Sequence, residues 1–154
     1  MADPKANKQV IVVEDDANDF TLIDHALRES GLACRTRRVD TAEELEEELL
    51  RLAPDLVVCD HASAKWDSFQ VLDRVREFHS NIPFVVVSGS LDERTQAALL
   101  SRGADGCVGK HRLEELAPVV AEAIRHQAEE QTRRVEEIRR SLPPLPVPRR
   151  HRCA

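Results

Sequence analysis

Residues 10–15 read Val-Ile-Val-Val-Glu-Asp, a short apolar run followed at once by two carboxylates. Such a run is typical of a strand that is buried on both faces of a parallel sheet. Sheets of this kind bind their ligands at the carboxyl ends of the strands. Glu14 and Asp15 repel each other there unless a cation lies between them, and their oxygens favour a hard ion such as Mg2+. The stretch therefore predicts a strand that ends in a metal site.

The same pattern of an apolar run and a polar residue recurs three times, ending at Asp60, Ser88 and Lys110. Strict alternation of strand and helix patterns predicts an α/β fold with a five-stranded parallel sheet and helices on both faces. Right-handed crossovers favour the flavodoxin-like strand order 2-1-3-4-5, with the arginine-rich second strand at an edge. The predicted strands are 10–13, 34–39, 56–59, 84–87 and 106–109, and the helices between them are 18–30, 43–52, 69–79 and 94–102.

Composition and charge limit the function. The chain has 154 residues and a net charge of −6, which suits one domain with appendages. Residues 1–110 hold 13 basic against 21 acidic side chains, so general binding to nucleic acid is not expected. The apolar runs are too short for a membrane span or a signal peptide, so we expect a cytoplasmic protein without a membrane partner. The four cysteines have no metal-ligand spacing.

Glu14, Asp15, Asp60, Ser88 and Lys110 all fall at strand ends on one edge of the predicted sheet. A metal held by the three carboxylates would leave one Asp60 oxygen free as a nucleophile toward phosphorus. Ser88 and Lys110 would then hold the phosphoryl oxygens. Each of these residues also has a simpler reading, as a loop acid, a strand-end hydroxyl or a surface lysine. Their alignment at four strand ends favours a site.

Four segments of the chain, ending in Asp16, Asp60, Gly89 and Lys110, resemble the receiver domain of two-component response regulators. They read Val-Ile-Val-Val-Glu-Asp-Asp, Pro-Asp-Leu-Val-Val-Cys-Asp, Ile-Pro-Phe-Val-Val-Val-Ser-Gly and Gly-Ala-Asp-Gly-Cys-Val-Gly-Lys. The resemblance covers residues 9 to about 127.

The resemblance implies that Asp60 accepts a phosphoryl group from a sensor histidine kinase or a histidine phosphotransferase. It also implies Mg2+ bound by Glu14, Asp15, Asp60 and the backbone carbonyl of Ala62. The chain would then be a phosphorylation-controlled switch rather than an enzyme, and it would signal by contact with a downstream protein that the sequence does not identify.

Three departures from the family pattern keep an alternative open. Residues 61–68 lack the usual proline and glycine, His111 follows Lys110 where most receivers have proline, and Cys107 replaces the aromatic residue that moves inward in many members. The alternative is a pseudo-receiver that acts as an interaction or dimerisation module without phosphorylation. Enzymes on similar sheets fit less well, because there is neither a Gly-rich first turn nor an Asp-x-Asp motif.

The last predicted helix, from Leu113 to about Ser141, is longer than the fold needs. Residues 1–8 are expected to be disordered, 9–127 to form the receiver domain, 128–142 to extend its last helix, and 143–154 to be a Pro/Arg-rich disordered tail. A 3-4 spacing of mostly apolar residues predicts a coiled-coil seam that would allow a homodimer, and the alternative is a solvated helix. The seam consists of Ala121, Ile124, Ala128, Gln131, Val135, Ile138 and Leu142.

Overall fold

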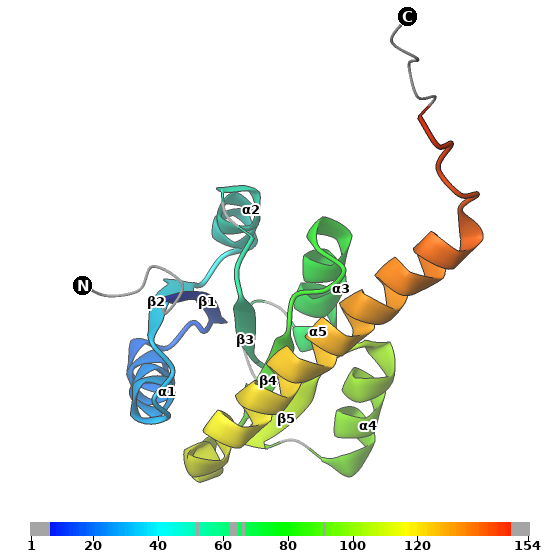
Figure 1. Cartoon of the computed structure of the whole chain (residues 1–154). Helices are drawn as coiled ribbons and strands as arrows, with labels where there is room; N and C mark the ends of the chain where they lie inside the picture. Colours follow the sequence, from blue (N-terminus) through cyan, green and yellow to red (C-terminus); the bar gives the residue numbers. More distant parts are fainter. Residues whose placement is uncertain (1–6, 52, 62–64, 66, 91, 149–154) are drawn as a thin grey trace, which may run out of the picture.

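Five parallel strands form one sheet in the order β2-β1-β3-β4-β5, so the predicted fold class and strand order are confirmed. The structure, a computed structural model, describes residues 7–51, 53–61, 65, 67–90 and 92–148 (Figure 1). Its elements are β1 (Lys8–Val13), α1 (Ala17–Glu29), β2 (Cys34–Val39), α2 (Ala42–Arg51), β3 (Leu56–Asp60), α3 (Ser68–Phe78), β4 (Phe84–Ser88), α4 (Glu93–Arg102), β5 (Gly106–Gly109), the 3-10 helix η2 (Lys110–Glu115) and α5 (Leu116–Ser141).

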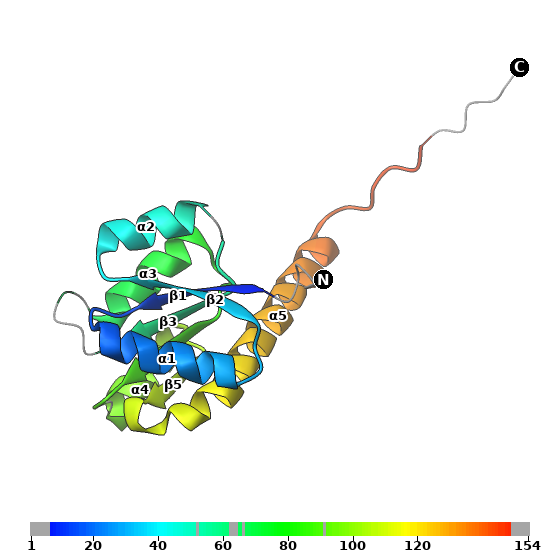
Figure 2. The ribbon, with the colours of Figure 1, turned by 90° about the vertical axis from the view of Figure 1, so that its left-hand side faces the viewer.

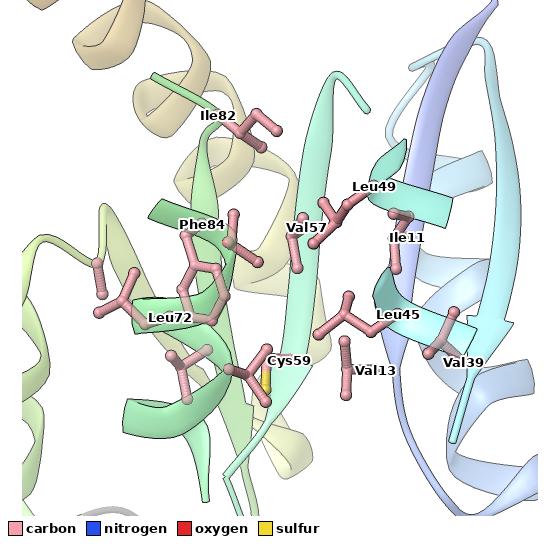
Figure 3. Packing of buried hydrophobic residues seen from close by; sticks show 14 of the residues in the cluster. Ile11, Val13, Val39, Leu45, Leu49, Val57, Cys59, Leu72, Ile82 and Phe84 are labelled. Atoms are coloured by element: carbon pink, nitrogen blue, oxygen red, sulfur yellow. The ribbon is translucent and has the colours of Figure 1, made fainter. Parts of the chain in front are cut away.

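Two apolar clusters fill the two faces of the sheet. One joins the strands to α2, α3 and α4, and the other joins them to α1 and α5 (Figure 2). In Figure 3, Leu45 and Leu49 of α2 face Ile11, Val13 and Val57 of the central strands. Successive strand residues point to opposite faces, and helices cover both faces. The strands β3 and β4 are therefore buried along their whole length. The helices therefore leave the strand ends as the place where polar side chains meet solvent.

The helix ends carry capping residues that are typical of helix termini. Gly31 and Gly103 have positive φ angles of 82° and 115°, as expected for residues that end helices. At the start of α2, the Glu44 N–H donates to Thr41 Oγ1 at 3.1 Å. A capping box that the sequence reading did not predict forms at the start of α3, between Asp67 and Gln70.

The connection from β5 to α5 differs from the prediction of a helix that begins at Leu113. Residues 110–115 form the 3-10 helix η2, and Arg112 within it has non-helical angles of −132° and 44°. The α-helix begins only at Leu116. It packs so closely on β5 that a Cβ at Gly106 would lie 2.5 Å from Val119 Cγ1, so a larger residue at this position would force Val119 or the helix to move. None of the described helices, α5 included, is apolar over enough length to span a bilayer.

Asp105, just before β5, holds α5 to the sheet. Its fully buried carboxylate accepts hydrogen bonds from the Phe84 N–H at 2.9 Å and from Gln127 Nε2 at 2.9 Å. It also lies 2.7 Å from His126 Nδ1 and 3.3 Å from the guanidinium of Arg76. These contacts fix α5 near its middle. Beyond them, the helix extends past the sheet (Figures 1 and 2).

Candidate functional site

The carboxylates that follow β1 and end β3 lie together at one edge of the sheet. Val13 is opposite Cys59 in the parallel pair of β1 and β3, so Glu14 and Asp60 come next to each other. One oxygen of each of Glu14, Asp15 and Asp60 lies within 4.8 Å of the others. Carboxylate oxygens at this spacing suit a hard divalent cation.

Glu14 is the buried member of this cluster. Its side chain is inaccessible to solvent, and its Oε1 accepts the Asp16 N–H at 3.1 Å. Its Oε2 is buried without a hydrogen-bond partner among the described residues. Burial, together with the negative charge of Asp60, raises the pKa of Glu14 to about 7, although the Asp16 N–H and Lys110 act in the opposite direction. This oxygen accepts no hydrogen bond among the described residues and faces other acids, with only the Lys110 ammonium at 3.4 Å to offset its charge, so it suits a bound cation.

Lys110 is the first residue of η2, directly after the edge strand β5, and its side chain extends to this cluster. Its Nζ lies 3.2 Å from Asp60 Oδ2 and 3.4 Å from Glu14 Oε2. Its nearest partner is Asp19 Oδ2 at 2.7 Å. Partial burial alone would lower the pKa of Lys110, but the hydrogen bonds to Asp19 and Asp60 outweigh it and raise the pKa above its ordinary value. The lysine therefore stays charged. One ammonium against four carboxylates leaves negative charge for a further cation to neutralise.

Asp19 was not predicted as a site residue. It lies in the first turn of α1, three residues after the helix N-cap Asp16, whose side chain accepts the N–H groups of Asn18 and Asp19. An acidic residue in a first helical turn is usually explained by its favourable interaction with the helix dipole, so the sequence gives no separate sign of another role. The available signal was the density of acids between residues 14 and 19.

Ser88 ends β4 at the same edge and is paired with Gly109, the residue before Lys110. The Ser88 side chain is buried. Its Oγ accepts the Ser90 N–H at 3.2 Å. Because that bond uses a lone pair of the hydroxyl, its hydrogen remains available for donation to an oxygen bound at the site.

The segment after Asp60 carries a second polar pair. His61 Nδ1 and the buried Ser68 Oγ lie 2.5 Å apart, and the His61 ring meets Phe69 edge-on at 6.3 Å. This pair joins the end of β3 to the start of α3. Ala62, whose carbonyl was predicted as a metal ligand, lies outside the described residues, so that prediction stays a prediction.

Cys107 in β5 is half-buried and packs against the cluster formed by α2, α3 and α4. Burial raises the pKa of its thiol to about 11, so it remains a thiol at neutral pH and behaves as a small apolar side chain. It therefore takes up packing space without adding charge beside the site.

Comparisons with known proteins show what this chain is similar to. The family model described as the response regulator receiver domain matches residues 10–130. The DNA-binding transcriptional regulator NtrC of Escherichia coli (strain K12) is 26% identical over 123 residues, which are 79% of this chain and 26% of that protein. The chain thus spans about a quarter of the length of the NtrC proteins that it matches.

Solved structures of response regulators are similar to this chain as well. The phosphorylated cyanobacterial phytochrome response regulator RcpA is 26% identical, with a TM-score of 0.62 over 75% of this chain and 89% of that one. The beryllofluoride-activated NtrC4 receiver domain dimer is 21% identical, with a TM-score of 0.67 over 77% of this chain and 98% of that one. The second likeness concerns the fold alone.

Proposed function

Because the chain belongs to the response regulator receiver domain family, we propose that it is a signalling switch that accepts a phosphoryl group on Asp60. The observation that carries the proposal is the position of Asp60. It ends the central strand β3, is almost fully buried, and faces two further carboxylates and one ammonium. A carboxylate held between a cation site and a lysine is arranged for nucleophilic attack on a phosphoryl group.

The phosphoryl donor in this proposal is a phosphohistidine of a sensor histidine kinase or a histidine phosphotransferase. An Asp60 oxygen forms the new bond to phosphorus while the P–N bond of the donor breaks, and the electron pair of that bond returns to the imidazole nitrogen. Lys110 holds the oxygens of the transferred group by its charge, and Ser88 donates its hydroxyl hydrogen to one of them. The transferred group draws Lys110 away from Asp19.

Mg2+ is the cofactor in this proposal. Glu14, Asp15 and Asp60 would hold the ion, with the Ala62 carbonyl as an expected fourth ligand. When bound, the ion neutralises charge on the phosphoryl oxygens. The buried Glu14 contributes an oxygen that otherwise has no hydrogen-bond partner among the described residues. Its burial keeps water away from one side of the site.

The output in this proposal is a protein contact controlled by phosphorylation. Phosphorylation changes the partners of Lys110, which begins η2 and leads directly into α5. A readout through α5 also suits the presence of Cys107 in β5, because a thiol cannot act as an inward-moving aromatic ring. From the sequence, either a second copy of the chain or a different downstream protein could make that contact.

Intact-mass measurement after incubation with acetyl phosphate and Mg2+ tests the assignment. The wild type should gain one phosphoryl group, and Asp60→Asn should gain none. Asp73→Asn is the matched control, since Asp73 is an exposed acid on α3 that pairs with Arg102 away from the site. It should label like the wild type.

Labelling of Asp60→Asn to the same extent as the wild type would refute Asp60 as the acceptor. A wild type that binds no phosphoryl group, from acetyl phosphate or from a phosphorylated histidine phosphotransferase, would favour the pseudo-receiver alternative. The departures at residues 61–68, Cys107 and His111 give that alternative its support.

A further inference from the structure

The part of α5 beyond the sheet carries an apolar row that the fold does not use. Ile124, the second residue of the predicted seam, packs against the core, and Ala121 before it is exposed. The exposed seam is defined as the part of the row beyond Ile124, namely Ala128, Gln131, Val135 and Ile138 of α5 and Leu142, the extended residue directly after the helix. Val135, Ile138 and Leu142 are 49%, 57% and 62% exposed. Gln131 marks the border, since its Oε1 accepts a hydrogen bond from Asn81 Nδ2 at 2.9 Å.

The residues beside the exposed seam are basic. Arg134 and Arg139 occupy the two heptad positions that flank an apolar seam, where side chains meet those of a partner helix. Among the described residues neither arginine forms an ion pair, although Arg134 donates to Ser80 Oγ at 3.3 Å. Arg133, farther from the seam, is paired with Glu130. The positive charge next to the seam is therefore not neutralised within the chain.

The acidic side chains of the same segment lie away from the seam. Glu129 and Glu136 share one heptad position, and Glu130 and Glu137 share another, and neither position faces a partner across the seam. The heptad positions that flank the seam in this segment thus carry arginine and no acidic residue, whereas Arg133 and Arg140 lie opposite the seam beside the glutamates. The flanking charge selects between partners, because charges beside a seam set partner choice in coiled coils.

A second copy of the chain is a poor partner for this surface. In a parallel pair, Arg134 of one copy would face Arg139 of the other, and the same repulsion would occur on both sides of the seam. An antiparallel pair would also bring two basic flanks together. The seam read from the sequence allowed a homodimer, but only two heptads of it are exposed, which is too little apolar contact to offset repulsion between like charges.

We propose that the exposed seam binds an amphipathic helix of another protein, one with an apolar stripe flanked by glutamate or aspartate. The apolar stripe covers Val135, Ile138 and Leu142, and the acidic flanks neutralise Arg134 and Arg139. The proposal does not depend on phosphorylation of Asp60, because the unmodified chain already exposes the seam. It specifies the chemistry of one partner, whichever residue accepts a phosphoryl group.

Two synthetic helical peptides provide the probes. Both have three heptads with identical leucine core positions, and they differ only in carrying glutamate or lysine at the flanking positions. Fluorescence anisotropy with the full chain should show that the glutamate peptide binds about tenfold more tightly than the lysine peptide, and that this preference shrinks at about 0.5 M salt. Sedimentation of the full chain alone should show a monomer.

Three variants make the test specific. Val135→Glu/Ile138→Glu should abolish binding of the glutamate peptide. Arg134→Glu/Arg139→Glu should reverse the preference toward the lysine peptide, a gain of binding that misfolding cannot imitate. Arg133→Glu/Arg140→Glu is the matched control, because it changes the same charge at the position opposite the seam, and it should bind like the wild type.

Equal binding of the two peptides would overturn the proposal, as would no binding of the glutamate peptide at about millimolar concentration. A wild-type dimer that Val135→Glu/Ile138→Glu converts to a monomer would also overturn it, because the second copy would then be the occupant.

Discussion

Lys110 Nζ lies 2.7 Å from Asp19 Oδ2, closer than the 3.2 Å that separates it from Asp60 Oδ2. The lysine therefore joins the end of β5 to the first turn of α1, across 91 residues of sequence, as well as to the site. Any group that binds next to Asp60 competes with Asp19 for this ammonium. The energy of that pair sets how readily Lys110 can be drawn away.

We expect a double-mutant cycle to show that this pair is a real but modest interaction. Asp19→Asn, Lys110→Met and the combined variant should give a coupling of about 1 kcal/mol in urea unfolding, since both side chains are partly exposed and solvent screens them. Asp24→Asn, which removes a partner of Arg28 on the same helix, should show no coupling to Lys110. A coupling of zero for Asp19 would mean that the lysine is held by Asp60 and Glu14 alone.

Glu14 should make the metal-free protein less stable as pH rises. Its pKa is about 7 in the folded chain and near 4.5 in the unfolded chain, so between these values the folded state binds more protons. Stability gained from the protonated form is complete below pH 4.5 and is lost as pH rises to 7. The free energy of unfolding of Glu14→Gln should therefore increase relative to that of the wild type as pH rises across this window, by on the order of 1 to 3 kcal/mol.

Urea unfolding in EDTA between pH 4.5 and 8 measures this difference. Glu43→Gln, on the exposed surface of α2, is the control and should show no such divergence from the wild type. If the difference in stability between Glu14→Gln and the wild type stays constant over this range, the pKa of Glu14 is the same in the folded and unfolded chains and burial does not raise it.

Mg2+ should stabilise the wild type and lose this effect when Asp15 is removed. For a dissociation constant on the order of 1 mM, about 10 mM Mg2+ adds about 1.4 kcal/mol to the free energy of unfolding. Asp15→Ala removes one of three carboxylates and should abolish most of the gain, whereas Asp73→Ala should keep it. The same gain in all three proteins would point to nonspecific screening rather than to a site.

Gly106→Ala should destabilise the chain by about 1 to 3 kcal/mol, because the added methyl would meet Val119 Cγ1. Val119→Ala removes the obstructing methyl groups, so the double variant should be more stable than Gly106→Ala alone. Thermal unfolding of the four proteins gives the comparison. A double variant whose loss equals the sum of the two single losses would show that the close approach of α5 to β5 is not the cause.

The order and direction of the strands could be predicted because each is marked by its own apolar run, and parallel strands must end at a common edge. That edge brings Glu14, Asp15, Asp60 and Lys110 together without further information. Asp19 could not be predicted in the same way, since its contact depends on how α1 is oriented against the start of η2.

The junction between β5 and α5 escaped prediction for a related reason. The helical pattern of residues 113–115 is compatible with an α-helix, but the close packing of Val119 on Gly106 and the kink at Arg112 delay the helix to Leu116. The hydrogen bonds that Asp105 forms with Phe84, Gln127 and Arg76 likewise depend on tertiary contacts that no local pattern encodes.

The contacts of Asp105 lie where the buried part of α5 ends, because Leu116, Val120 and Ala123 before them pack in the core. The helix has 26 residues, and the part after Gln127 extends about 21 Å beyond these contacts. A tilt of about 5° at that point would move the far end by about 2 Å. The far end carries Val135 and Ile138, and the buried part leads back through η2 to Lys110. A partner that fixes the far end therefore restrains the residues next to the site as strongly as a change at the site displaces the partner.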